Sequence, residues 1–285
     1  MTLEQLRIFI AVAEREHITR AAEALHLTQS AVSSAIAALE SRHGITLFDR
    51  VGRAIILNET GRTFLPEAKG VLDRAKAAEA ALDDLSGLRR GKLSIMASQT
   101  IASYWLPEHL AIYRRQHPHI ELEVHFANTD QVADAVESGQ AEVGLVEGVV
   151  DRPTLSAKVF AQDEMVVVTA PGHWWGSRAN AKLGQVEWIV REEGSGTRAM
   201  FDRLAKDVDV KIVLTLPGNE AVLGAVEAGL GATFVSMSVA QSRIAAKSVV
   251  VVDGFSRTRS FFMLHHKERF RTKAADAFID IASSR

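Results

Sequence analysis

The sequence predicts an α+β protein of several domains: a small helical N-terminal domain with a β-hairpin, a linker helix, and a larger two-lobed α/β domain. Three observations support this class. Two short alanine-rich helical patterns adjoin a hairpin pattern within the first 60 residues, a heptad-like pattern follows, and the remainder alternates β-branched runs with helical segments.

Composition allows this organisation and excludes several alternatives. The chain has 285 residues, of which 47% are apolar and 24% are charged, so it can form a sizeable core and more than one domain. Its lack of cysteine excludes disulfides and thiolate chemistry. The net charge of −2 argues against a grossly basic nucleic-acid binder. Without a signal-peptide pattern or an apolar run of membrane-spanning length, the sequence predicts a cytoplasmic protein with no membrane partner.

The first of two paired helices is predicted to begin at Thr19, whose hydroxyl can cap it, and to end near His26. Thr28 then offers a second N-cap. In the helix that follows, Val32, Ile36 and Leu39 are spaced to form one apolar stripe against the first helix. With the hairpin that follows, this pattern is typical of a winged helix-turn-helix.

The opposite face of the second helix carries small and polar residues. Small side chains let a helix approach the floor of the DNA major groove, and hydroxyl and amide groups can bond base edges and phosphates. An ordinary packed surface helix is the alternative, since an Ala/Ser-rich helix with one apolar face is common. The predicted reading surface consists of Thr28, Gln29, Ser30, Ser33 and Ser34.

The hairpin adds two cations to this reading surface. The strand-like runs 45–48 and 54–57 flank a predicted turn, Asp49–Arg53. Arg50 and Arg53 are expected to contact phosphates or enter a minor groove, although a solvated turn would also explain them.

The order of helix, helix-turn-helix, LFDR wing, ETGR and long helix resembles the N-terminal domain of LysR-type transcriptional regulators, and the similarity continues to the C-terminus. The resemblance implies promoter DNA, a small anionic metabolite and a second copy of the chain as partners, as a homodimer or dimer of dimers. It leaves RNA polymerase as a further partner and implies no cofactor or metal. One departure concerns base preference, because family members commonly carry a larger polar pair where this chain has Ser34 and Ala35.

The predicted DNA-binding region is formally neutral, because each of its seven arginines in residues 1–64 is matched by a carboxylate. Affinity for DNA is therefore expected to depend on where the cations lie and on the presence of two DNA-binding domains in a dimer.

A seam of apolar residues predicts the linker helix that would form this dimer. Its members alternate steps of four and three: Phe64, Ala68, Val71, Ala75, Ala78, Leu82 and Leu85. Pro66 is expected to kink or delay the helix. The alternative is a helix lying on its own chain. The predicted boundaries are 1–58 for the DNA-binding domain, 59–90 for the linker helix and hinge, and 91–285 for the effector domain.

Beyond residue 91, short β-branched runs alternate with helical segments, which favours an α/β fold with largely parallel sheets. Nearly two hundred residues with this many strands suggest two lobes. The LysR resemblance implies a type 2 periplasmic-binding-protein-like domain whose chain crosses between lobes near 161–162 and again near His265–His266. Lobe 1 would hold about 91–161 and 266–285, lobe 2 about 162–265, and the cleft between them would bind an effector.

Each predicted lobe has hydroxyl-bearing residues where its first strand meets a helix. Ser98, Gln99 and Thr100 follow the first strand of lobe 1. In lobe 2, a glycine-flanked run supplies Ser195, Gly196, Thr197 and Arg198. Free N–H groups at helix N-termini favour anions, and arginine pairs with oxyanions. Capping alone is the alternative for each segment.

The GSGTR run is similar to a motif of the LysR-type branch that includes regulators of carbon fixation and sulfur oxyanion metabolism. Two weaker candidates follow in the same domain: Glu147, at a strand end, is expected to line or gate the cleft, and Asn219 is expected to cap the helix over 220–228.

Two other functions compete with DNA-binding regulation. An enzyme lacks support, since the chain has no complete G-x-S-x-G elbow, P-loop or H-E-x-x-H motif, and no catalytic residue is assigned. A cytoplasmic solute-binding protein could use the two lobes, but it would not need residues 1–60. The sequence therefore predicts a LysR-like regulator of transcription that is not an enzyme.

Overall fold

The structure is a computed structural model that describes residues 1–51, 54–85, 91–177 and 182–284. The chain divides into two compact units, Met1–Leu82 and Asp83–Arg285, and each is described by itself.

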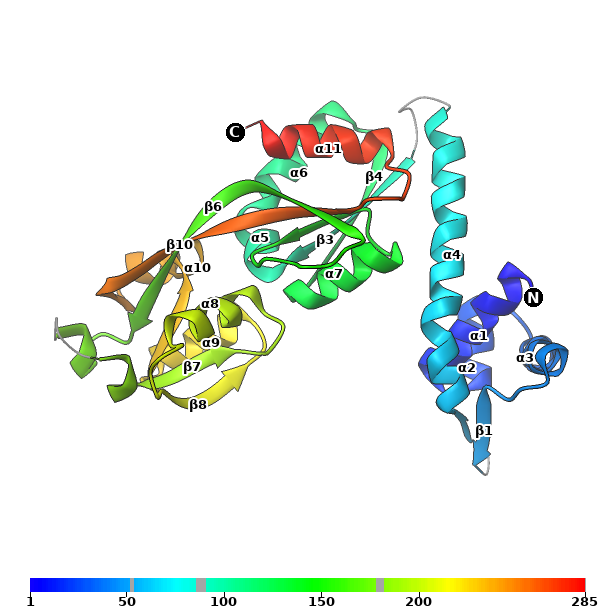
Figure 1. The fold of residues 1–285 in the computed structure, drawn as a ribbon, viewed down its shortest axis with the longest axis horizontal. Coiled ribbons are helices and arrows are strands. Elements are labelled where there is room, and N and C mark those ends of the chain that lie inside the picture. Colours follow the sequence, from blue (N-terminus) through cyan, green and yellow to red (C-terminus); the bar gives the residue numbers. More distant parts are fainter. Residues whose placement is uncertain (52–53, 86–90, 178–181, 285) are drawn as a thin grey trace. The chain divides into compact units, whose positions relative to one another are not determined.

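The N-terminal unit consists of helices and a two-stranded antiparallel sheet (Figure 1). Its elements are α1 (Leu3–Arg15), α2 (Ile18–Leu25), α3 (Gln29–His43), β1 (Phe48–Val51), β2 (Ala54–Leu57) and α4 (Glu59–Leu85). Val32, Ile36 and Leu39 of α3 are buried together with Phe9 and Val12 of α1, so the predicted apolar stripe forms the core.

The caps of the helix pair agree with prediction except at its start. Thr28 caps α3 by accepting the Ala31 N–H at 3.2 Å, and α2 ends at His26 in a left-handed conformation. The predicted cap at Thr19 is wrong, because α2 begins one residue earlier, at Ile18. His17 has extended backbone there, and its Nδ1 accepts the Arg20 N–H at 3.3 Å, which leaves Thr19 inside the helix.

The first strand of the wing begins three residues later than predicted, whereas the second strand has its predicted bounds, Ala54–Leu57. The first strand starts at Phe48, where the prediction placed the last residue of the strand, and Val51 pairs with Ala54. The C-terminal end of α3 holds the preceding segment: Ile45 N–H bonds the Glu40 carbonyl, and Leu47 N–H bonds Glu40 Oε1 at 2.7 Å. Those contacts satisfy groups that a strand would use, so pairing begins only at Phe48.

Helix α4 begins at Glu59, so Pro66 lies inside it and does not delay it. Asn58 Oδ1 accepts the Gly61 N–H at 2.8 Å and caps the first turn. Gly61 also permits a close approach to the wing, because a Cβ there would lie 2.2 Å from the Leu47 carbonyl oxygen. Phe64 packs against Phe9 with ring centroids 5.1 Å apart. These contacts anchor the helix before the proline.

The seam of α4 divides into two parts. Phe64 and Ala68 pack on their own unit, as the alternative interpretation expected. Val71 is 41% exposed and Leu82 is 69% exposed. The second half of the seam is thus an apolar face that its own unit leaves open.

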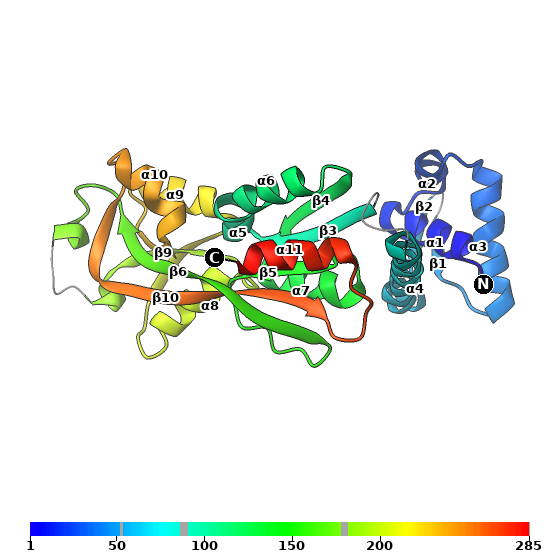
Figure 2. The ribbon, with the colours of Figure 1, turned by 90° about the horizontal axis from the view of Figure 1, so that it is seen from above.

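The C-terminal unit is built on one eight-stranded sheet flanked by helices (Figures 1 and 2). The strands are β3 (Gly91–Ser98), β4 (Ile120–Ala127), β5 (Val143–Val146), β6 (Leu155–Thr169), β7 (Glu187–Arg191), β8 (Lys211–Leu216), β9 (Ala232–Ser236) and β10 (Val250–His266). The helices are α5 (Gln99–Tyr104), α6 (Leu106–Gln116), α7 (Thr129–Ser138), α8 (Gly196–Leu204), α9 (Asn219–Glu227), α10 (Met237–Ala245) and α11 (Lys273–Ser283), with short 3₁₀ turns η1 (Trp174–Ser177) and η2 (Leu183–Gln185).

Two lobes share this sheet, whose order is β4-β3-β5-β10-β6-β9-β7-β8. Strand β3 pairs in parallel with β4 and β5 in the first lobe, and β7 pairs in parallel with β8 and β9 in the second. The sheet is mixed rather than largely parallel, because the chain crosses on β6 and returns on the antiparallel β10.

The return crossing lies earlier than predicted. Ser260 pairs with Gln162, so the two long strands cross together at this level. The predicted second crossing at His265–His266 is wrong: His265 pairs with Ser156, and Leu264 pairs with Gly144 of β5 within the first lobe. Because antiparallel pairing fixes the return strand to the outgoing one, residues 261–266 must lie in the first lobe.

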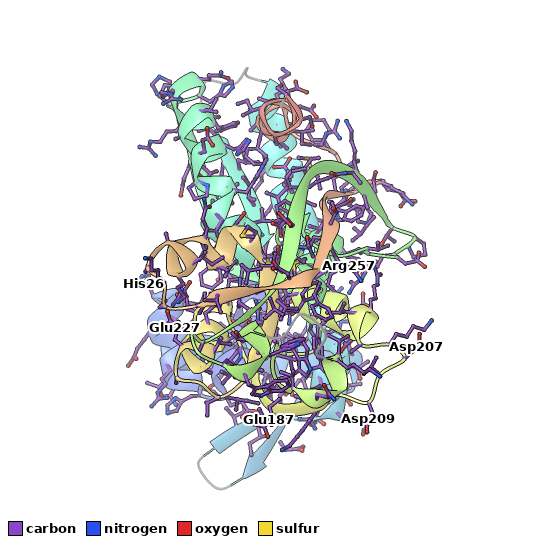
Figure 3. All side chains as sticks on the ribbon, turned by 90° about the vertical axis from the view of Figure 1, so that its left-hand side faces the viewer. His26, Glu187, Asp207, Asp209, Glu227 and Arg257 are labelled. Atoms are coloured by element: carbon purple, nitrogen blue, oxygen red, sulfur yellow. The ribbon has the colours of Figure 1, made fainter. Side chains whose placement is uncertain are left out.

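Apolar side chains on both faces of the sheet hold each lobe together. In the second lobe, Met165 and Val167 of β6 pack in the core beneath α8, whereas Val166 and Val168 pack beneath α9 and α10. This two-sided burial explains why the strand reads as a continuous apolar run. The loop after α8 carries Asp207 and Asp209, which project from the surface (Figure 3). Among the described residues, no helix is long and apolar enough to span a membrane.

Candidate functional site

The polar face of α3 is accessible. Thr28, Gln29, Ser30 and Ser34 are exposed, and Ser33 is half-buried between them and the core stripe. Thr28 and Ser30 also share a hydrogen bond of 3.1 Å between their hydroxyls. The predicted reading residues therefore form one small, uncharged surface at the start of a helix.

The wing is described only in part. The backbone of Arg50 belongs to β1, where it pairs with Ile55. The Arg50 side chain and all of Arg53 lie outside the described residues, so their expected phosphate contacts stay predictions.

In the C-terminal unit, side chains of the first lobe bind the start of a second-lobe helix. Gln99 Oε1 accepts the Asn219 N–H at 2.7 Å, and the Thr100 hydroxyl accepts the Asn219 amide at 3.2 Å. Asn219 was expected to cap α9, but it is the first helical residue, and Gly218 precedes it with a left-handed φ of +98°. Its side chain is thereby available to join the two lobes.

A buried ion pair lies where β6 and β10 cross. Asp163 and Arg259 face each other in the register, and the Arg259 Nε donates to Asp163 Oδ2 at 2.8 Å. Their side chains are 4% and 2% exposed. The same guanidinium donates to the Thr197 hydroxyl at 3.2 Å and approaches the Thr100 hydroxyl at 3.5 Å. Arg259 thus connects the helix start of each lobe to the crossing strands.

A second buried arginine, Arg191, holds Asn219 in this network. Arg191 donates to Asn219 Oδ1 at 2.6 Å and forms a two-point ion pair with Glu192. Burial would raise the pKa of Glu192, but hydrogen bonds and charge from Arg191 outweigh it, and the pKa lies below its ordinary value. Glu192 therefore stays ionised and fixes the guanidinium that orients Asn219.

A pocket of about 470 Å³ opens beside Arg259 between the two lobes. First-lobe residues at strand and helix ends, including Thr129 and Glu147, line one side, and the start of α8 lines the other. The lobes touch here: a Cβ at Gly196 would lie 3.0 Å from Thr129 Oγ1 and 3.1 Å from the Glu147 carbonyl oxygen. The volume falls within the range of small-molecule sites.

The predicted effector residues fall into two groups. Glu147, Ser195, Gly196 and Arg198 line this pocket. Gln99, Thr100 and Thr197 instead belong to the hydrogen-bonded junction beside it. Ser98 belongs to neither group: it is buried, and its hydroxyl has no partner within the described part of the chain.

Arg198 was expected to pair with an anion, yet it is held within its own lobe. It forms an ion pair with Asp202 at 2.9 Å and donates to the Arg191 carbonyl. The buried cation at the junction is Arg259, which sequence reasoning missed together with Asp163 and Thr129. One signal was present: Arg259 and Asp163 are opposite charges that immediately precede two apolar strand runs, SFFML and EMVVV.

Comparison with known proteins agrees with this architecture. Residues 3–62 match the bacterial regulatory helix-turn-helix protein of the lysR family, and residues 86–285 match the LysR substrate binding domain. The chain is 32% identical over 292 residues to the RuBisCO operon transcriptional regulator of Allochromatium vinosum, covering 100% of this chain and 96% of that protein. It is also 32% identical over 286 residues to the HTH-type transcriptional regulator YeiE of Escherichia coli K12, covering 98% and 96%.

Solved structures share the fold at lower identity. CbnR, a LysR family transcriptional regulator, matches with a TM-score of 0.74 at 21% identity, covering 99% of this chain and 98% of CbnR. The regulatory domain of CcmR from Synechocystis PCC6803, in complex with 2-PG, matches with a TM-score of 0.63 at 23% identity, covering 68% and 97%.

The fold and the matched domains define a DNA-binding transcriptional regulator with an effector-binding domain. The chain belongs to the LysR family.

Proposed function

We propose that this regulator reads promoter DNA with the polar face of α3, through Thr28, Gln29, Ser30, Ser33 and Ser34, while Arg50 and Arg53 of the wing contact phosphates. The observation that supports this assignment is the exposure of that face opposite a fully buried stripe. Short uncharged side chains suit close approach to base edges. Cations outside α3 would then supply most of the attraction to phosphate.

A serine substitution tests the docking surface. Ser33→Glu places a carboxylate against phosphates and acceptor edges, so it should abolish specific binding in a gel shift with DNA from upstream of the gene itself. Ser41→Glu, exposed two turns further along α3, is the matched control and should bind nearly normally. Unchanged affinity of the Ser33 variant would remove α3 from the interface.

We further propose that a small anionic metabolite binds between the lobes and shifts their closure. The supporting observation is the pocket beside the buried Arg259, with the start of α8 on its wall. The CcmR complex with 2-PG supports a small-molecule effector in this fold. A binding role rather than catalysis suits the site, because Arg259 and Asp163 are committed to each other.

Two threonines test this cleft. Thr100→Val and Thr197→Val remove hydroxyls that bond Arg259, so each should lose ligand-induced thermal stabilisation while DNA binding is spared. A screen of phosphate, phosphate esters, sulfite, sulfate and small carboxylates supplies the ligand. Thr169→Val is the control, because Thr169 is buried and its hydroxyl has no partner among the described residues. A full response in both variants would refute the cleft assignment.

The remaining partners follow from the family. We propose self-association through the open half of the α4 seam, a cytoplasmic location, and contact with RNA polymerase at the promoter. We also propose 1–58, 59–90 and 91–285 as the functional segments. A solute-binding protein without a DNA role is disfavoured, because residues 3–62 match a regulatory helix-turn-helix.

A further inference from the structure

Two buried acceptors in the pocket wall lack a hydrogen-bond donor. Glu147 is 5% exposed and Thr129 is 6% exposed. Glu147 Oε1 and Thr129 Oγ1 have no partner among the described residues, and both residues line the pocket. An unpaired buried carboxyl oxygen in such a position is costly, so a bound molecule that donates a hydrogen bond to it would be favoured.

The opposite wall supplies donors. Helix α8 has nine residues, and Ser195 at its N-cap makes no side-chain capping bond, so the first backbone N–H groups keep their donor capacity. Gly196, the first helical residue, lies against the Thr129 hydroxyl and the Glu147 backbone carbonyl, and the lining of one pocket contains Thr129, Glu147 and the α8 N-terminus.

The charges of the pocket are not those of a simple anion trap. Arg259 is neutralised by Asp163, and Arg198 is paired with Asp202. Glu147 is the buried acid of the pocket lining without an ion-pair partner in the described chain, whereas Asp130, Glu193 and Arg203 are exposed. A fully ionised oxyanion at the start of α8 would meet the Glu147 carboxylate with no proton between them.

We propose that the effector is an anion that carries its own hydrogen-bond donor, such as a hydroxy acid or a protonated oxyanion. Its anionic oxygens bind the N–H groups of α8, and its O–H donates to Glu147, with Thr129 completing the contact. This inference rests on the proposed effector role of the cleft and names the ligand class that the cleft selects.

Two matched pairs of probes test the selection by calorimetry on the full chain. Glycolate and acetate differ by a hydroxyl, and at mildly alkaline pH hydrogen phosphate and sulfate are both dianions but only phosphate retains a proton. Glycolate and phosphate should each bind about tenfold or more tightly than their partners, the range expected for a hydrogen bond to a charged acceptor.

Glu147→Gln should erase this discrimination, because the amide can donate to an ionised oxygen. Sulfate and acetate should then bind as well as their partners. Glu268→Gln makes the same change at an exposed acid outside the pocket lining and should leave the discrimination intact. Melting without ligand verifies folding, and Glu147→Gln should melt close to the unsubstituted protein, because glutamine keeps the size of the side chain.

The outcomes separate the inference from the proposed function. Equal binding within both pairs by the unsubstituted protein leaves the cleft function standing and overturns the inference. Discrimination that survives Glu147→Gln also overturns it. Absence of binding by all four probes overturns the cleft function and the inference together.

Discussion

Arg259 and Asp163 hold the point at which the chain passes between the lobes. Their charges are almost fully removed from water, and their hydrogen bonds extend to Thr197, Thr100 and Ser236. Burying two charges is costly, so such a pair adds little net stability but is costly to break from one side. The pair instead fixes geometry, because it gives the crossing strands defined hydrogen-bond partners in both lobes.

Arg259→Met should therefore destabilise the C-terminal unit by about 3–5 kcal/mol, because Asp163 would be left buried and unpaired. Urea unfolding of the C-terminal unit within the full chain measures the loss. The double change Arg259→Met with Asp163→Leu should recover much of it. A loss below about 1 kcal/mol for the single change would show that the pair is hydrated, contrary to its burial.

Gly196 determines how closely the lobes approach. A methyl group there would meet Thr129 and the Glu147 carbonyl at 3.0–3.1 Å, so Gly196→Ala should hold the cleft open and weaken ligand binding. Gly224→Ala is the control, because a Cβ at Gly224 in α9 meets nothing within 4 Å. That change should stabilise the protein by up to about 1 kcal/mol without affecting the ligand. Equal ligand affinity in both variants would show that the contact at Gly196 does not limit closure.

At the scale of elements, some local signals were predictable from sequence, although the caps expected at Thr19 and Asn219 lie elsewhere, and tertiary contacts were not predictable. Thr28 was found as a cap because capping depends on the next three residues. The first strand of the wing was placed three residues early because the Glu40 side chain, in α3, accepts the Leu47 N–H. The Arg259–Asp163 pair joins residues 96 positions apart, so the sequence shows each charge beside its apolar run but not that the two charges pair.

Helix α4 illustrates the same limit. Its heptad-like spacing is evident in the sequence, but spacing does not separate Phe64 and Ala68, which pack within the unit, from Val71 and Leu82, which do not. Within this seam, we therefore expect the exposed half to bind a second copy of the chain.

Val71→Glu should therefore shift the protein toward monomers while the N-terminal unit stays folded, as judged by analytical ultracentrifugation and circular dichroism. Ala68→Glu should instead unfold that unit, since Ala68 is fully buried. Lys76→Glu, outside the seam, should leave the assembly unchanged. Retention of the full oligomer by the Val71 variant would place self-association elsewhere on the molecule.

At the scale of the whole molecule, the regulator combines a DNA-binding domain without net formal charge with a pocket between two lobes. The buried Arg259–Asp163 pair holds the crossing strands beside that pocket. Because residues 1–64 carry no net formal charge, we expect one copy to bind DNA weakly and paired DNA-binding domains to be needed for affinity. A ligand can alter DNA binding only to the extent that it binds the two states of the cleft differently.

The most direct test measures the affinity of the full chain for its own upstream DNA by fluorescence anisotropy, with and without a saturating cleft ligand at fixed salt. Ligand should change the affinity by about 5- to 150-fold, or change the footprint, and Thr197→Val should abolish the change. A ligand that binds the cleft by calorimetry yet leaves both affinity and footprint unchanged would contradict the coupling of cleft to reading head.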